Sequence, residues 1–209
     1  MVARLDDMSD DELLQRFVAG EPAAFGVLLK RYQVPIYNFI ARSVRDTEAA
    51  SDLLQEVFTR VIQHSGEFNR SSKFSTWLYA IARNMCIDHM RRMSHRRHAS
   101  LDSPGPNGSG GSDGGAVAPW VERVAHEQPA VDSSAAGGGL RSRIAQAIEN
   151  LPAEQREVFL MRQLQQLPFA EIAVVVGVSE NTVKSRMRYA LERLQEALAD
   201  CAEYARAEV

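Results

Sequence analysis

Cysteine is scarce in the 209-residue sequence, which has only Cys86 and Cys201. The two lie far apart and form no Cys-x-x-Cys pair, which disfavours both a disulfide framework and a zinc site. Both fall inside helical patterns, where a free cysteine packs as a small apolar residue. The sequence also lacks a secretory signal and any apolar run of about 18 residues, the length that a membrane helix needs. We therefore expect a soluble, cytoplasmic protein.

Strand-like alternation of apolar and polar residues is also missing, whereas helical periodicity covers almost the whole chain. An excess of positive charge is absent too, because the formal net charge is −3. A protein that holds DNA by itself is expected to be basic. The charge is uneven, since residues 6–12 are acidic and residues 83–97 are basic. The sequence predicts an all-α protein with a local basic face, whose DNA contacts depend on a partner for most of their affinity.

Catalytic and metal-binding patterns are not found either. The sequence has no evident nucleophile–base pair and no phosphate-binding Gly loop. Three histidines, His89, His95 and His98, lack nearby cysteines or well-spaced carboxylates and sit in an Arg-rich run, so they do not favour a metal site. We predict that the protein is not an enzyme and holds no metal or cofactor.

Residues 99–139 differ in composition from the rest of the chain, with Gly, Ser, Pro, Asp and Ala predominating, as in SPGPNGSGGSDGG. Such a segment cannot bury enough apolar surface to offset the entropy of ordering, so it is predicted to be a flexible linker. Within it, Trp120, Val121 and Val124 could dock or form one helical turn. A structureless stretch of this length favours two domains, which we place at residues 1–98 and 140–209.

The stretch from Leu167 to Leu198 has the pattern of a helix-turn-helix. An apolar helix at 169–176 is followed by Gly177, which can adopt positive φ, and by Ser179, a good N-cap for a helix at about 180–198. The apolar face of that helix comprises Val183, Met187, Ala190, Leu191, Leu194 and Leu198. Its outer face carries hydrogen-bond donors for bases or phosphates, namely Asn181, Lys184, Ser185 and Arg188. The alternative is an ordinary helical hairpin with a solvated basic face.

Three helical segments in the first half are indicated by capping and by periodicity. Ser9 and Glu12 form the sequence pattern of a capping box at the start of the first helix. The next apolar stripe runs through Pro35, which should kink or break the helix. Residues 47–64 form the strongest helix, with a buried stripe at Leu53, Leu54, Val57, Phe58, Val61 and Ile62. Asp52, Gln55 and Glu56 lie on its outside, and the pattern alone favours a solvated face.

Aromatic and basic residues alternate in the loop 67–75 and in the helix predicted at about 76–93. Aromatic rings can stack on unpaired bases while cations hold the backbone of a single strand. Phe68, in a polar loop, is the better candidate for a base contact, whereas Trp77 is expected in the core. Asn84, Asp88 and Arg91 are spaced to share one exposed face of the helix.

With these motifs in place, the chain outside the linker resembles a bacterial RNA polymerase sigma factor of the extracytoplasmic-function (ECF) group. The run DLLQEVF, residues 52–58, is similar to the family's polymerase-binding segment. FSTWLYAIARNMCIDHMRR is similar to its promoter-melting and minus-10 segment, and residues 151–194 are similar to its minus-35 domain. The three matches occur in the family's order.

The resemblance implies a promoter-specificity subunit that binds core RNA polymerase and promoter DNA, is controlled by an anti-sigma factor and forms no stable homo-oligomer. The implied polymerase-binding residues are Asp52, Gln55, Glu56 and Phe58. The implied minus-10 residues are Phe68, Lys73, Trp77, Arg83, Asn84, Arg91 and Arg92. The implied minus-35 residues are Ser179, Asn181, Thr182, Lys184, Ser185 and Arg188. The chain departs from the family in its longer, Gly-rich linker and in the sequence of the 67–75 loop.

Linker length bears on how the two domains reach DNA. About 40 flexible residues span roughly 35 Å when relaxed, whereas the promoter elements lie on the order of 60 Å apart, nearly two turns of DNA. We therefore expect polymerase to hold the domains apart and the free protein to bind promoters weakly. Two alternatives stay open at this point: a stand-alone helix-turn-helix regulator with an N-terminal sensor or dimerisation domain, and a helical adaptor that binds protein.

Overall fold

The computed structural model describes residues 4–69, 72–101 and 135–200. Within these ranges the chain forms helices and no strand, which confirms the predicted all-α class. The short 3-10 helices are η1 (Leu5–Asp7) and η2 (Ser65–Glu67). The N-terminal α-helices are α1 (Asp10–Val18), α2 (Pro22–Val44), α3 (Thr47–His64) and α4 (Phe74–Leu101). The C-terminal ones are α6 (Ala135–Glu149), α7 (Ala153–Gln165), α8 (Phe169–Val176) and α9 (Glu180–Ala197).

The boundaries of the predicted linker differ slightly from the helix ends. Helix α4 runs to Leu101 and α6 begins at Ala135, so both helices extend a few residues into the segment 99–139. Residues 102–134, with the predicted docking segment around Trp120, lie outside the described residues. The division into two domains therefore stays a prediction.

Helices α1 to α4 pack around a core of fully buried side chains, among them Leu13, Leu28, Phe39, Leu54 and Tyr79. Ser9 caps α1 through the predicted capping box, because its hydroxyl accepts from the Glu12 N–H while the Glu12 carboxylate accepts from the Ser9 N–H. The hydrogen bonds to Ser9 lower the pKa of the Glu12 carboxyl. Both hydrogen bonds of the capping box were therefore predictable from the residue types at positions 9 and 12.

Pro35 does not break its helix, because α2 is continuous from Pro22 to Val44. A proline inside a helix removes one backbone hydrogen bond and crowds the preceding turn, at a cost of about 3 kcal/mol. The side chains that follow it, Ile36, Phe39 and Ile40, are almost completely buried. Burial of each such side chain stabilises the fold by roughly 1.5–3 kcal/mol, which is enough to keep the helix intact.

The C-terminal helices form the predicted helix-turn-helix from α8 and α9. Gly177 ends α8 with φ +72°, the left-handed conformation that glycine adopts without a Cβ penalty. Ser179 then caps α9, its hydroxyl accepting from the Thr182 N–H at 3.2 Å. The apolar side of α9 is buried at Val183, Met187, Ala190 and Leu194. The turn chemistry therefore sets the angle at which α9 leaves α8.

Two apolar positions were predicted wrongly as buried. Leu191 on α9 is 46% exposed and Ile62 on α3 is 45% exposed. Both lie at the edge of their helix's apolar stripe. Periodicity gives the direction in which a side chain points, but it does not say how far the neighbouring helices extend to cover it.

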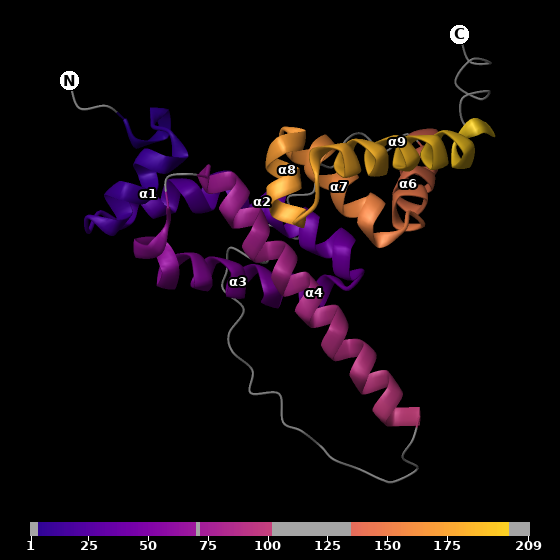
Figure 1. Cartoon of the computed structure of the whole chain (residues 1–209), viewed down its shortest axis with the longest axis horizontal. Helices are drawn as coiled ribbons and strands as arrows, with labels where there is room; N and C mark the ends of the chain where they lie inside the picture. Colours follow the sequence, from indigo (N-terminus) through magenta and orange to yellow (C-terminus); the bar gives the residue numbers. More distant parts are fainter. Residues whose placement is uncertain (1–3, 70–71, 102–134, 201–209) are drawn as a thin grey trace.

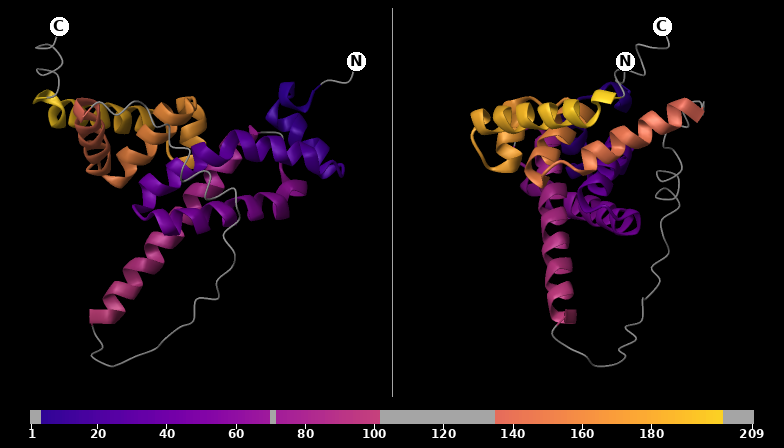
Figure 2. Two further views of the ribbon diagram at one scale, coloured as in Figure 1. Left: turned by 180° about the vertical axis from the view of Figure 1, so that it is seen from behind. Right: turned by 90° about the vertical axis from the view of Figure 1, so that its right-hand side faces the viewer.

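The N-terminal and C-terminal helices lie against each other, α8 on α4 and α7 on α2 (Figures 1 and 2). The C-terminal part of α4 projects away from this body in each view. The Arg45 guanidinium donates to the backbone carbonyl of Glu149, which joins the end of α2 to the end of α6. The two predicted domains thus form one continuous body, an arrangement that the composition of the linker did not predict.

The α9 cap gives a first testable expectation. Ser179→Ala should destabilise the protein by about 1 kcal/mol, the usual cost of losing an N-cap hydroxyl. Urea unfolding of the full chain, followed by helical circular dichroism, would measure the change. Ser142→Ala, at an exposed position inside α6, is the matched control and should leave the transition unchanged or raise it slightly. Equal destabilisation by both variants would contradict the capping role.

Candidate polymerase and nucleic-acid interfaces

The outer face of α3 presents two carboxylates, Asp52 and Glu56, to solvent. Gln55 lies between them and is half-buried. These side chains line a shallow depression together with Thr59, Arg60 and Gln63. Neither carboxylate forms an ion pair with any other residue in the part of the chain that the structure describes. The face is therefore free to receive a partner that carries hydrogen-bond donors or cations.

Phe58, which was assigned to the same polymerase-binding segment, lies on the opposite side of the helix. It is 3% exposed, and its ring packs edge-on against Phe25 with the centroids 6.2 Å apart. Its burial rules out a direct contact with a partner in this conformation. Phe58 instead anchors α3 in the core and so fixes the direction in which Asp52 and Glu56 point.

Three aromatic rings meet where the loop after η2 leads into α4. The Phe68 ring lies 5.2 Å from that of Trp77, and both rings lie within 6.4 Å of the Phe74 ring, measured between centroids. Phe74 is buried, whereas Phe68 and Trp77 are half-buried. Trp77 packs against the core, as expected, but it is only partly buried and also lines a hollow at the surface.

Trp77 and Asn84 line one hollow of about 320 Å³, whereas Phe68 lines a different one beside α1. Of the two aromatic residues in the implied minus-10 set, Trp77 rather than Phe68 therefore shares a hollow with Asn84. Sequence reasoning missed the other residues of the hollow, which are Arg60, His64, Glu67 and Ile81. Their helical spacing carries the signal: residues 60 and 64 share a face of α3, and residues 77, 81 and 84 share a face of α4.

The cations assigned to the minus-10 surface are divided between two environments. Arg91 and Arg92 are exposed on the projecting part of α4. Lys73 and Arg83 instead form ion pairs with the C-terminal helices, Lys73 with Glu171 at 2.6 Å and Arg83 with Glu157 at 2.7 Å. The hydrogen bond to Glu171 raises the pKa of the Lys73 ammonium.

On α9 every assigned donor is exposed, from Asn181 through Thr182, Lys184 and Ser185 to Arg188. Lys184 pairs with Glu180 at 2.7 Å, and Arg188 lies 3.6 Å from Glu192. Both are pairs four residues apart on a solvated helix surface, which contribute little and exchange readily with other anions. Ser179 differs in that its hydroxyl is used by the α9 cap.

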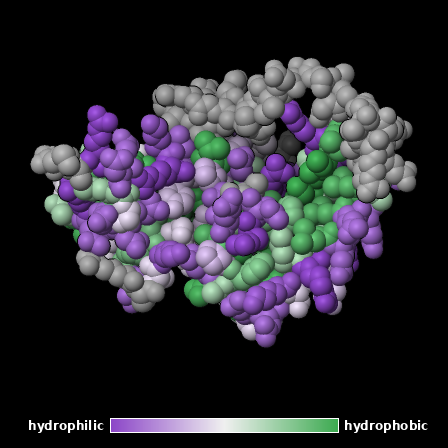
Figure 3. All heavy atoms as spheres, turned by 90° about the horizontal axis from the view of Figure 1, so that it is seen from above, coloured by the Kyte–Doolittle hydropathy of each residue, from purple (hydrophilic) through white to green (hydrophobic). Residues whose placement is uncertain are grey.

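The C-terminal helices also expose large apolar side chains. They are Leu140, Ile144, Val174, Tyr189 and Leu191. Figure 3 shows hydrophobic surface on the side of the molecule where these helices lie. Surface of this kind is suited to burial against another protein.

Comparisons with known proteins match two stretches of the chain to one family. The family description "Sigma-70 region 2" matches residues 28–97, and "Sigma-70, region 4" matches residues 141–194. The ECF RNA polymerase sigma factor SigM of Mycobacterium tuberculosis (strain ATCC 25618 / H37Rv) is 30% identical over 192 residues, which cover 92% of this chain and 86% of SigM. The chain belongs to the ECF sigma factor family. SigW of Bacillus subtilis (strain 168) is 25% identical over 93% of this chain and 99% of SigW.

Two solved structures share this fold. CnrH, in complex with the cytosolic domain of CnrY, aligns with a TM-score of 0.61 at 22% identity, covering 93% of this chain and 99% of CnrH. The sigma factor RpoE of Bartonella quintana, in complex with the anti-sigma factor NepR, aligns with a TM-score of 0.62 at 21% identity, covering 84% and 96% of the two chains. At these identities the likeness shows a shared fold.

As an ECF sigma factor, the protein is a promoter-specificity subunit that binds core RNA polymerase and promoter DNA, and it is not itself an enzyme. The stand-alone regulator and the adaptor do not account for the region 2 match. In the described residues, no helix combines the length and apolarity needed to cross a bilayer. Cys86 is buried, and burial raises the pKa of its thiol to about 12, so it is a packing residue without thiolate chemistry.

Proposed function

We propose that this sigma factor engages polymerase and promoter through three separate surfaces. The α3 face with Asp52, Gln55 and Glu56 docks on core polymerase. The hollow between Trp77 and Asn84 takes a melted minus-10 base, and the donor face of α9 reads duplex minus-35 DNA. The observation that carries the proposal is that Asp52 and Glu56 on α3 and the donors of α9 are exposed on separate helices, so polymerase and duplex DNA do not compete for one surface.

The hollow is suited to a base that has left the stack. Capture of such a base needs an aromatic wall and a polar group for the Watson–Crick edge. Trp77 supplies the ring, and the Asn84 amide supplies both a donor and an acceptor. The exposed Arg91 and Arg92 farther along α4 then contact the phosphates that lead away from the hollow.

On α9, the outward side chains suit a major-groove reader. Lys184 and Arg188 lie about one turn apart on the face that points away from the buried stripe, with Ser185 beside them. Arg188 can make paired hydrogen bonds to a guanine edge or to a phosphate, whereas Lys184 acts as a single charge. The helix N-terminus that follows Ser179 places backbone N–H groups near the phosphates, where the helix dipole favours an anion. The Thr182 N–H is not among them, because it donates to the Ser179 hydroxyl.

We also propose that an anti-sigma factor controls this chain. CnrH and RpoE of Bartonella quintana share its fold, and the RpoE structure holds an anti-sigma factor. The exposed apolar side chains on α6, α8 and α9 give such a regulator a surface to cover.

Run-off transcription tests the proposed function. Purified bacterial core polymerase is assayed on a promoter library with and without the protein. Promoter-specific transcripts that require the protein are the expected result. A core enzyme that gains no promoter activity, while the protein alone footprints a duplex operator, would support a stand-alone regulator instead.

Asn84→Ala should lower transcript yield about tenfold, since a base contact of this kind contributes about 1–3 kcal/mol. It should also relax the preference for one minus-10 base across the library. Asn84 is exposed, so the fold should be unaffected. Asn150→Ala, the same substitution at an exposed turn, is the control and should transcribe like the wild type. A loss of yield without any change of base preference would argue against base capture by Asn84.

A further inference from the structure

We propose that the free chain inhibits its own binding to minus-10 DNA. Acidic residues of α7 and α8 form ion pairs with two cations of the proposed minus-10 surface. These ion pairs must open before the promoter is melted. The inference rests on the proposed function, because it takes Lys73 and Arg83 as DNA contacts. It assigns a competing role to Glu157 and Glu171, which no resemblance had singled out.

Glu171, on α8, contacts the start of α4 with both carboxylate oxygens. One oxygen lies 2.6 Å from Lys73 Nζ, and the other accepts from the Thr76 hydroxyl at 3.0 Å. The Glu171 side chain is only 17% exposed, so its charge faces the N-terminal helices rather than solvent. A carboxylate in this position takes the place that a phosphate would take beside Lys73 and Thr76.

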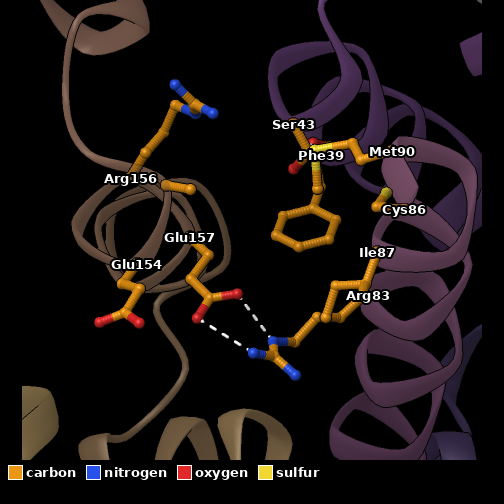
Figure 4. Close-up of a pocket in the computed structure, with 10 residues that line it drawn as sticks. Phe39, Ser43, Arg83, Cys86, Ile87, Met90, Glu154, Arg156 and Glu157 are labelled. Carbon is orange, nitrogen blue, oxygen red and sulfur yellow. Dashed lines mark hydrogen bonds and ion pairs between the residues drawn. The ribbon is translucent and has the colours of Figure 1, made fainter. Parts of the chain in front are cut away.

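Glu157, on α7, forms a two-pronged pair with Arg83 (Figure 4). Arg83 Nε lies 2.7 Å from one oxygen, and an Arg83 terminal nitrogen lies 3.2 Å from the other. The planar guanidinium binds carboxylate and phosphate with the same paired geometry. The two side chains are 19% and 15% exposed, so Arg83 cannot meet DNA while this pair is closed.

The contact covers the two minus-10 cations unequally, because the Arg83 side chain is 19% exposed whereas the Lys73 side chain remains 67% exposed. The side chains of Lys184 and Arg188 are 52% and 64% exposed, and they pair only with neighbours on their own helix. Arg186, on the inner side of α9, instead turns to Glu154 and Glu157. The closed arrangement therefore covers part of the minus-10 cations and leaves the minus-35 face open.

Two features of the contact between the C-terminal and N-terminal helices allow it to open. Beside the Arg83–Glu157 pair, the helices leave a hollow of about 180 Å³ lined by Phe39, Cys86 and Met90, so the apolar packing there is incomplete. A partly buried ion pair also contributes little net stability, because desolvation offsets most of its attraction. DNA phosphates and polymerase can then compete with Glu157 and Glu171 without unfolding either set of helices.

The test removes the two carboxylate charges in the full chain. Glu157→Gln with Glu171→Gln should bind a fluorescent single-stranded non-template oligonucleotide, taken from the most active promoter of the library, at least about fivefold more tightly in the absence of polymerase. X-ray scattering of the same variant should show a larger radius of gyration than the wild type. Glu48→Gln with Glu196→Gln changes the net charge equally at exposed positions, so it corrects for the general effect of charge on DNA affinity.

A charge swap, Arg83→Glu with Glu157→Arg, should have the same radius of gyration as the wild type, because the ion pair is rebuilt with its charges exchanged. Glu171→Gln alone is the milder variant if the double variant loses helical circular dichroism. Unchanged scattering and unchanged oligonucleotide affinity relative to the charge-matched control would overturn self-inhibition. If the wild type still directs promoter-specific transcription in that case, the proposed function stands; if it does not, the proposed function itself has failed.

Discussion

Replacing Asp52 and Glu56 by lysine is expected to lower the affinity for core polymerase about 100-fold, because like charges placed across an interface cost several kcal/mol. Transcription from every promoter should fall together, since docking precedes all promoter contacts. Both side chains are exposed, and the core beneath them, which includes Phe58, is untouched. Fluorescence titration of labelled protein with core polymerase measures the affinity, and run-off transcription measures its consequence.

The matched control for this result is Glu192→Lys with Glu196→Lys, two exposed acids that are also four residues apart, but on α9. This pair makes the same change of net charge and should retain the wild-type affinity for core. Equal loss in both double variants would mean that overall charge, rather than the α3 face, governs binding. A normal affinity in the α3 variant would remove this face from the docking surface.

Replacing Lys184 and Arg188 by glutamate is expected to weaken binding of the polymerase complex to minus-35 duplex DNA about 100-fold. A good base contact contributes about 1–3 kcal/mol of binding free energy, and each lost phosphate contact increases the loss. Promoters that depend on their minus-35 element should lose transcription, whereas docking on core should stay unchanged. Both residues lie on the exposed face of α9, so helix packing should be preserved.

Arg193→Glu is the control for this second result, because Arg193 is an exposed cation on the same helix that lies off the proposed DNA face. Titration at several salt concentrations adds a readout, as removing phosphate contacts should reduce the salt dependence of binding. If Arg193→Glu and Arg188→Glu weakened binding equally, general electrostatic attraction would explain the effect. If the double replacement of Lys184 and Arg188 left binding unchanged, α9 would not read the minus-35 element.

Much of the local structure was predictable, because its causes lie within a few residues. The Ser9–Glu12 capping box spans three positions, and the Gly177 turn and Ser179 cap follow directly from their residue types. The outward positions of Asp52, Glu56 and the α9 donors follow from helical periodicity. Sequence motifs in the right order also indicated the family, which the relatives then confirmed.

Predictions failed where a residue's environment depends on distant helices. Pro35 was expected to kink or break its helix, and α2 is not broken there, since burial of the side chains after it outweighed the local penalty. Trp77 packs against the core as expected, but the sequence did not indicate that it would also share a hollow with Asn84 and with residues of α3. Leu191 and Ile62 were expected to be buried, but no neighbouring helix covers them.

The sequence by itself determined where helices start, which faces they bury and which residue types they present, because capping and periodicity act within one or two turns. Only the tertiary structure decided that Arg83 meets Glu157, 74 positions away, and that Thr76 meets Glu171, 95 positions away. No local rule links residues at such separations. These contacts exist only because the packing of α7 and α8 on α2 and α4 brings the side chains within hydrogen-bonding distance.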